Sequence, residues 1–140
     1  KVHMVFIIHF WRTSYFILHY NKSTWCYNKC SAFLMTSRVE SFAIVVLEAL
    51  AHGCQCVSTD NPPLPEAFRS SANYYPSGDH IALARNIFAV LDRTPEERQT
   101  ARERACARSA QFSWSATAEQ TIELLMETVG VRSQNSKSDA

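Results

Sequence analysis

The sequence predicts an α/β fold in which a parallel sheet is followed by helices. Short apolar segments at residues 32–37, 54–59 and 72–76 have the pattern of buried strands, and a longer apolar segment between the first two favours a helix. Strands of this kind, apolar on both faces and connected through helices, are typical of parallel sheets. From residue 79 onward, three helix-start signals follow one another.

The composition indicates an ordinary globular domain or a piece of a larger one. Of the 140 residues, 46% are hydrophobic and 19% are charged. The net charge of +1 argues against a nucleic-acid partner held by overall charge. The five cysteines are an odd number without a recognisable secretory signal, so we expect reduced thiols and a cytoplasmic location.

Residues 1–26 form an atypical segment that is rich in aromatic and basic residues. Three interpretations stay open: two buried strands, "VHMVFII" and "YFILHY"; a segment that binds nucleic acid or a membrane surface; or a segment foreign to the ancestral fold. Arg12 and three histidines interrupt the apolar run and argue against a membrane-spanning helix. We therefore predict a boundary here, a domain over residues 27–130 and a disordered tail over residues 131–140.

The middle of the chain alternates strand and helix signals. "AFLMTS" predicts a strand, and "FAIVVLEALAH" (42–52) favours a helix because of its length, its alanines and the glycine that follows it. That helix is apolar nearly all round, so we expect it to be buried. "CQCVST" and "ANYYP" predict two more strands. The three prolines of "DNPPLPEAF" (60–68) predict a loop without regular structure.

Three capped helices are predicted next. Asp79 caps the first, Thr94 caps the second together with Pro95 and Glu97, and Ser113 caps the third. The second helix is rich in charged and small residues and is expected at the surface. The predicted apolar face of the first helix consists of Ile81, Ala84, Phe88 and Leu91, with Leu83 and Ile87 beside it; that of the third, expected to be partly exposed, consists of Trp114, Ala118, Ile122, Leu125 and Val129.

Polar loops at residues 36–40 and 58–62 follow two of the predicted strands. The carboxyl ends of parallel strands share one edge of the sheet, which is where ligands bind in such folds. Glu40 lies just before the buried helix, where free N–H groups and the positive end of the dipole favour an anion such as a diphosphate. Ser37 and Ser41 add hydroxyls. The alternative is that Glu40 only caps the helix or interacts with its dipole.

Glu48 is the more unusual carboxylate, because its helical neighbours are apolar. A buried, unpaired carboxylate is unfavourable, so Glu48 requires hydrogen-bond donors or a cation. Sugar or ribose hydroxyls would serve. A lysine or arginine of the fold could equally pair with Glu48. Alternatively, Glu48 lies at an exposed edge of the helix and needs no partner. Eight residues of helix bring Glu48 to within about 80° of the direction of Glu40.

The stretch "YNKCSAFLMTSRVESFAIVVLEALAHGCQCVSTDNPPLPEAF", from Tyr27, carries these features in a fixed order. It contains a tyrosine, a strand that ends in serine, two glutamates eight residues apart, an Ala-Leu-Ala-x-Gly helix end, a Ser-Thr-Asp strand end and a Pro-Glu loop. This order resembles the nucleotide-sugar-binding domain of retaining GT-B glycosyltransferases of family 4, the group 1 type. "PSGD" (76–79) and "QFSWSATAEQTIELL" (111–125) resemble later landmarks. The resemblance implies a partial Rossmann-like domain, the C-terminal half of a GT-B fold.

The resemblance assigns roles to individual residues. Glu40, the expected catalytic residue, would contact hydroxyls of the donor sugar near the reacting centre, and Glu48 would hold the ribose hydroxyls. No metal or other cofactor is expected, since helix dipoles and basic side chains carry the charge of the leaving diphosphate. The remaining expected donor-binding residues are Ser37, Arg38, Ser41, Phe42 and Ala43.

The resemblance also implies partners. We expect a UDP-linked sugar as donor and a glycan or lipid-linked acceptor. The acceptor-binding domain is not recognisable before Tyr27, so the chain resembles a truncated enzyme. The "SR-x-E" and "GC-x-x-VSTD" details look like bacterial enzymes that build lipopolysaccharide or capsule glycans, and peripheral association with the cytoplasmic face of a membrane stays open. The rival hypothesis is a non-catalytic remnant that binds nucleotide weakly or only packs against a partner.

Some positions depart from the family pattern. Ala43 replaces a glycine of the turn and adds a methyl group where the backbone approaches the ligand. Gln55 stands where proline is usual. The cysteine pairs Cys54-x-Cys56 and Cys26-x-x-x-Cys30 have no matching histidine pair, so they indicate packing or free thiols rather than a zinc site.

Overall fold

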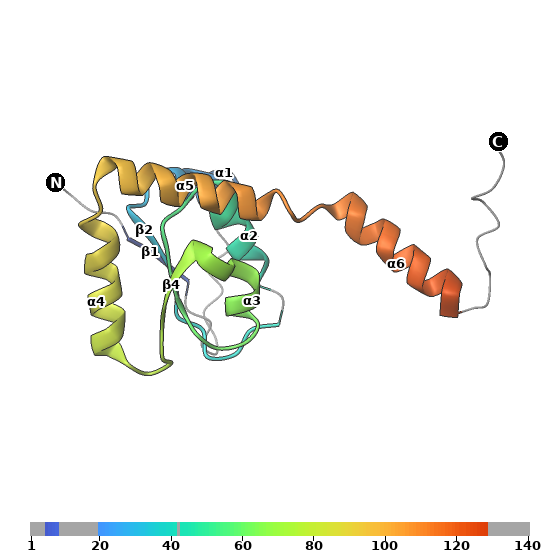
Figure 1. The fold of residues 1–140 in the computed structure, drawn as a ribbon, viewed down its shortest axis with the longest axis horizontal. Helices are drawn as coiled ribbons and strands as arrows, with labels where there is room; N and C mark the ends of the chain where they lie inside the picture. The colour runs from blue at the N-terminus through green and yellow to red at the C-terminus, as the bar shows by residue number, and fades with distance from the viewer. Residues whose placement is uncertain (1–4, 9–19, 42, 129–140) are drawn as a thin grey trace. The chain divides into compact units, whose positions relative to one another are not determined.

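A computed structural model describes residues 5–8, 20–41 and 43–128 (Figure 1). The chain divides into two compact units, Lys1–Ala110 and Gln111–Ala140. The first unit contains the sheet and five helices of the described part, and the second contains one described helix.

The sheet consists of four parallel strands in the order β1-β2-β3-β4. Neighbouring strands pair with Phe6 opposite Phe33, Phe33 opposite Cys56, and Cys56 opposite Ala72. All residues of β2 and β3 are buried, which confirms the predicted parallel sheet with two covered faces. The strands are β1 (Val5–Ile8), β2 (Ala32–Met35), β3 (Cys56–Thr59) and β4 (Ala72–Tyr75).

Helices connect and cover these strands. The described helices are α1 (Tyr20–Lys29), α2 (Ile44–Ala51), α3 (Leu64–Phe68), α4 (His80–Leu91), α5 (Pro95–Ser109) and α6 (Trp114–Thr128), with a 3₁₀ turn at Arg69–Ser71. In the described part of the chain, no helix has both the length and the apolar character that crossing a bilayer requires.

Two apolar clusters lie on opposite faces of the sheet. Alternate residues of β2 point to opposite faces, so Phe33 and Met35 belong to one cluster, whereas Ala32 and Leu34 belong to the other. Buried side chains of α1, α2, α3 and α5 complete the first cluster, and α4 covers the second. The first unit therefore has three layers, with α4 alone on one side among the described helices (Figure 1).

The proline-rich segment was predicted to be a loop, and that prediction is wrong for Leu64–Phe68. These residues form α3, which begins after Pro63 and has Pro65 in its first turn. Proline is tolerated in a first helical turn because the N–H group that it lacks has no helical partner there. Leu64 and Phe68 are buried in the first cluster and hold this short helix in place.

The predicted face of α4 is rotated from the observed one. Ile81 and Phe88 are 64% and 65% exposed, whereas Val90 is buried. The packed side chains are Ala82, Leu83, Ile87, Val90 and Leu91. The side-chain amide of Asn86, on the packed side, donates to the Tyr74 carbonyl of β4 at 3.0 Å, and this polar contact helps to fix the rotation.

The N-terminal segment is a strand at Val5–Ile8, as one interpretation of "VHMVFII" proposed. Tyr20, the last residue of "YFILHY", begins α1 instead of ending a strand, and residues 15–19 lie outside the described part. The helix α1 runs across the predicted boundary between residues 26 and 27. The division into residues 1–26, 27–130 and 131–140 stays a prediction.

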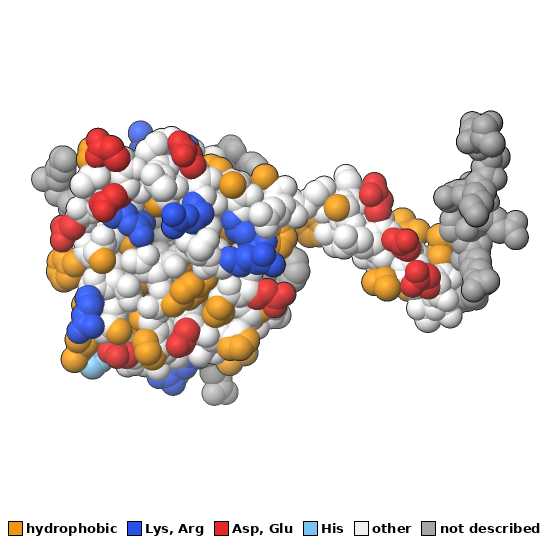
Figure 2. All heavy atoms as spheres, in the orientation of Figure 1, with side chains coloured by type: hydrophobic (Ala, Val, Ile, Leu, Met, Phe, Trp, Pro, Cys, Tyr) orange, Lys and Arg blue, Asp and Glu red, His pale blue; other side chains and the backbone are white. Residues whose placement is uncertain are grey.

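Helix α6 belongs to the second unit. Trp114, Ile122 and Leu125 of its predicted apolar face are 78%, 56% and 59% exposed, as expected, and Val129 lies outside the described residues. Acidic side chains follow the helix in Figure 2, whereas basic side chains gather over α5 in the first unit.

Candidate functional site

The two polar loops meet at the carboxyl edge of the sheet, as predicted. The hydroxyl of Thr59, the last residue of β3, donates to the carbonyl of Ser37 at 2.9 Å. The side-chain amide of Asn61 donates to the carbonyls of Arg38 and Ser37, at 3.2 and 3.4 Å. These bonds fix the loop after β2, which leads to the start of α2, against the loop after β3, which leads to α3.

Ser37 has a buried hydroxyl group without a partner. The residue is completely buried, and its Oγ makes no hydrogen bond within the described part of the chain. Leaving such a group unsatisfied costs about 1–3 kcal/mol. Such groups are rare in folded proteins, and a bound partner or a catalytic role is among their physical explanations.

The start of α2 is open in an unusual way. Its N-cap residue, Ala43, has φ 50° and ψ 51°, which is the left-handed region that favours glycine. No side chain caps this helix, and its first turn contains no acidic residue, in the part that the structure describes. The Val46 amide donates to the Ala43 carbonyl at 2.8 Å, whereas no side chain caps the amides of Ile44 and Val45 in the described part. The positive end of the helix dipole and these amides suit an anion. The backbone conformation also explains why glycine is usual at position 43.

Glu48 finds its donor in Tyr27. The hydroxyl of Tyr27 donates to Oε2 of Glu48 at 2.8 Å. Tyr27 is 4% exposed, and burial together with this hydrogen bond raises its pKa well above the ordinary value, so the phenol stays a donor at physiological pH. The carboxylate thus pairs with a phenol, and its second oxygen remains for another donor.

His52 and two cysteines support Tyr27. The rings of His52 and Tyr27 stack with centroids 5.2 Å apart, and Nδ1 of His52 is 2.8 Å from the carbonyl of Glu48. On the other side, the thiols of Cys30 and Cys54 each lie 3.4 Å from the carbonyl of Tyr27. The sequence pattern marked Tyr27 only as a landmark, because its distance of 21 residues from Glu48 follows no helical or strand period.

The other predicted residues have different surroundings. Glu40 is half-buried in the loop before α2, and Arg38 and Ser41 are exposed. Phe42 lies outside the described residues, so its predicted role stays a prediction. The apolar side chains of Val39, in this loop, and of Ile44, the first residue of α2, are 81% and 48% exposed. Sequence reasoning did not single out either residue.

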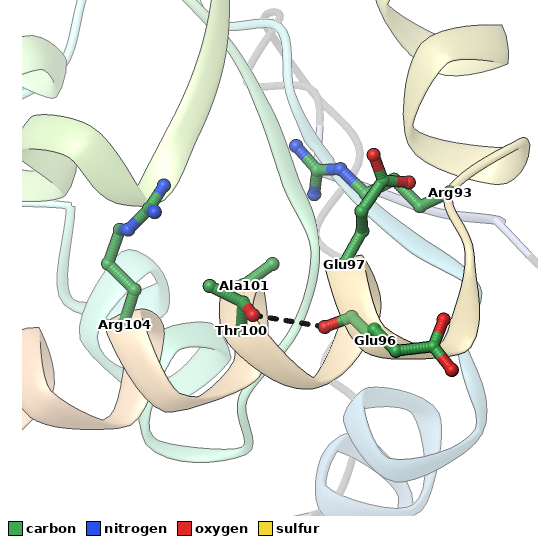
Figure 3. Close-up of a pocket in the computed structure, with 6 residues that line it drawn as sticks. All are labelled: Arg93, Glu96, Glu97, Thr100, Ala101 and Arg104. Carbon is green, nitrogen blue, oxygen red and sulfur yellow. Dashed lines mark hydrogen bonds between the residues drawn. The ribbon is translucent and has the colours of Figure 1, made fainter.

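A pocket of about 330 Å³ lies elsewhere, along the first turns of α5 (Figure 3). Arg93 and Arg104 lie at its two ends (Figure 3). The guanidinium of Arg93 is already engaged, since it donates to Gln55 at 3.1 Å and to Asn73 at 2.9 Å. No predicted site residue lines this pocket. Among the described residues, no group of three metal-ligating side chains could hold a metal ion.

The chain is similar to known proteins in both sequence and structure. The family model of "Glycosyl transferases group 1" matches residues 13–108, beginning upstream of Tyr27, where the sequence resemblance was recognised. The sucrose-phosphate synthase from Thermosynechococcus elongatus is similar in structure, with a TM-score of 0.66 and 25% sequence identity. The match covers 74% of this chain but only 27% of that one, so the chain spans about a quarter of its length. No curated relative matches. The fold of the chain is similar to the GT-B glycosyltransferase fold. The family match covers well over half of the chain, so this chain belongs to the group 1 glycosyl transferases.

Proposed function

We propose that this chain is the donor-binding part of a retaining glycosyltransferase that takes a nucleoside diphosphate sugar, UDP-linked, as its donor. The observation that carries this proposal is the pairing of Glu48 with Tyr27 beside an uncapped helix start. A carboxylate with one oxygen held at 2.8 Å by a buried phenol keeps a fixed direction. Its other oxygen is available to the vicinal hydroxyls of a ribose.

The diphosphate would lie at the start of α2. Its negative charge complements the dipole, and the first-turn amides of the helix would donate to its oxygens. The left-handed conformation of Ala43 directs the chain into the helix without a capping side chain. Glu40, in the same loop, would contact hydroxyls of the donor sugar, and the loops fixed by Thr59 and Asn61 would position it.

Catalysis in this proposal consists of positioning and of stabilising the leaving diphosphate. The bond between the sugar's anomeric carbon and the diphosphate oxygen breaks, the oxygen of an acceptor hydroxyl forms the new bond on the same face, and the hydroxyl proton passes to the leaving diphosphate. We propose a hexose as the transferred sugar and a glycan or lipid-linked acceptor, as in the assembly of lipopolysaccharide or capsule. The acceptor would be bound by an N-terminal domain outside the present sequence.

The proposal is tested by titrating the ¹⁵N-labelled chain with UDP and with UDP-glucose. We expect saturable shifts at the amides of Ser41 and Ala43–Val45 and near Glu48. Glu48→Gln should weaken UDP binding about ten-fold or more, because a hydrogen bond to a charged group is lost. Glu123→Gln, on α6 in the second unit, is the matched control and should leave the affinity unchanged.

Two results would contradict the proposal. Absence of shifts at millimolar UDP would favour the non-catalytic remnant. Equal losses in the Glu48 and Glu123 variants would show that the effect is one of general charge rather than of ribose recognition.

A further inference from the structure

Two of the five cysteines lie together beneath the candidate site. The Sγ atoms of Cys30 and Cys54 are 3.8 Å apart, within hydrogen-bonding distance for sulfur. Both thiols are free, and both approach the carbonyl of Tyr27. This carbonyl belongs to the last turn of α1, where helix carbonyls have no helical partner and need other donors.

The other cysteines have separate surroundings. Cys56 is 1% exposed, and its thiol donates to the carbonyl of Cys54 at 3.3 Å. Cys106, on α5, is 3.9 Å from the carbonyl of Ala51. Cys30 is partly exposed while Cys54 is only 5% exposed, so a reagent from solvent reaches Cys30 first.

We propose that Cys30 and Cys54 are a redox-active dithiol, which a low-molecular-weight disulfide converts to an intramolecular disulfide, and that this change weakens the Tyr27–Glu48 hydrogen bond. The sulfur atoms must close from 3.8 Å to about 2 Å, which requires both side chains to rotate. Disulfides in cytosol-like compartments are mostly of this transient kind.

The exchange has two steps. The Cys30 thiolate attacks one sulfur of the reagent, which releases one thiol and leaves a mixed disulfide on Cys30. Cys54 then loses its proton and attacks Cys30 Sγ, which releases the second thiol. Two protein thiols are oxidised and one reagent disulfide is reduced, so that two electrons and two protons pass to the released thiols.

The hydrogen bond between the thiols supports this order. It lowers the pKa of Cys30, because a neighbouring S–H stabilises the thiolate. The same bond, together with burial, raises the pKa of Cys54. Cys30 is therefore the attacking residue and Cys54 the resolving one.

Oxidation has a structural consequence for Tyr27. Its carbonyl loses both thiol donors, and the end of α1 is drawn toward Cys54. Tyr27 also carries the hydroxyl that holds Glu48, at the other end of the same residue. A displaced Tyr27 therefore weakens the fixed direction of the Glu48 carboxylate.

The dithiol is tested by incubating the full chain with oxidised glutathione, alkylating the remaining thiols and mapping tryptic peptides by mass spectrometry. Cleavage after Lys29, Arg38 and Arg69 places Cys26, Cys30 and Cys54 in three different peptides. We expect a cross-link between peptides 30–38 and 39–69. A cross-link that contains Cys26 or Cys106, or a lasting glutathione adduct on Cys30 in the unmodified chain, would overturn the proposal.

Variants separate the two steps. Cys54→Ser should stop at a lasting glutathione adduct on Cys30, and Cys30→Ser should leave Cys54 unmodified because it is buried. Cys26→Ser is the matched control and should form the cross-link at the normal rate. A cross-link between peptides 30–38 and 39–69 in Cys54→Ser, which would have to use Cys56, would overturn Cys54 as the resolving residue. A glutathione adduct on Cys54 in Cys30→Ser would overturn Cys30 as the attacking residue.

The effect on the site rests on the proposed function and has its own readout. We expect the oxidised chain to bind UDP about five-fold more weakly than the reduced chain, which corresponds to the loss of one hydrogen bond. Equal affinities would overturn the coupling to Tyr27. If the reduced chain does not bind UDP, the proposed function fails, while peptide mapping still decides the dithiol.

Discussion

The helices α2 and α5 pack against each other but begin in opposite ways. The start of α5 is closed by its own side chains: Thr94 accepts from the Glu97 amide at 3.2 Å, and Glu97 accepts from the Thr94 amide at 2.8 Å. The start of α2 has a left-handed alanine and no capping side chain among the described residues. Both helices belong to one folded unit, so the difference is local in origin.

The contrast indicates that, among the described residues, the start of α2 lacks the stabilisation by side chains that the start of α5 has. An N-cap side chain contributes about 1 kcal/mol, and α2 has an alanine at position 43, where a serine or aspartate would be the usual cap. Instead, the uncapped end of α2 follows the same loop that begins with Ser37, whose buried hydroxyl is unpaired within the described part of the chain. The one buried side-chain atom without a partner in the described chain thus belongs to the loop that leads to the proposed anion site.

The largest expected effect comes from closing the open helix start. Ile44→Glu places a carboxylate at the first residue of α2, where Ile44 is 48% exposed. We expect UDP affinity to fall about ten-fold or more, because the new charge competes with the diphosphate. Stability should change by less than about 0.5 kcal/mol, since the gain from the dipole offsets the lost apolar contact. Calorimetric titration and urea unfolding measure the two quantities.

Ile44→Gln is the control for shape and polarity and should retain most of the affinity. If the glutamine variant loses as much affinity as the glutamate variant, the helix start does not bind the diphosphate, and the contrast between α2 and α5 has no bearing on the site.

A smaller effect comes from opening the closed helix start. Thr94→Ala removes the acceptor for the Glu97 amide and should lower the free energy of unfolding by about 1 kcal/mol. UDP affinity should not change. Thr94→Ser keeps the acceptor and should restore most of the stability in urea unfolding. A large loss of UDP affinity in Thr94→Ala would show that the two helix starts are not independent.

The smallest effect concerns the backbone at position 43. Ala43→Gly removes the strain of a left-handed alanine at the cost of greater freedom in the unfolded chain, and we expect a net stabilisation of about 0.5 kcal/mol. Gly53→Ala is the converse, because Gly53 has φ 68° and an added Cβ would lie 2.5 Å from Cγ of Arg102. Thermal unfolding should show opposite signs for the two variants, and a destabilised Ala43→Gly would contradict the strain.

Much of the fold follows from local chemistry that a sequence displays. The caps at Asp79 and Thr94 were predictable because each hydrogen-bonding pair spans three residues. The strands were predictable because short apolar runs between turn signals have few alternatives. Helix α3 was missed because prolines exclude the interior of a helix but not its first turn.

The missed features share a dependence on distant residues. Two apolar stripes are present on α4, and only the sheet beneath it decides that Ile87 is packed while Phe88 is exposed. Glu48 could be identified as unusual from its apolar neighbours, but not its donor Tyr27, since no period links the two positions. The sequence indicated the left-handed backbone at Ala43 only indirectly, because an alanine stands where the family pattern has a glycine.

The all-parallel pairing of the sheet determines how the chain can assemble. Each strand pairs with one that lies beyond a crossover, as with Val5 opposite Ala32, so no hairpin can nucleate the sheet. Closing these loops loses entropy before any pairing rewards it. Arg93, which joins Gln55 to Asn73, can act only after all four strands have left the ribosome. The native contacts of this unit are therefore complete only once α5 has been synthesised, because Ala105 belongs to the first apolar cluster.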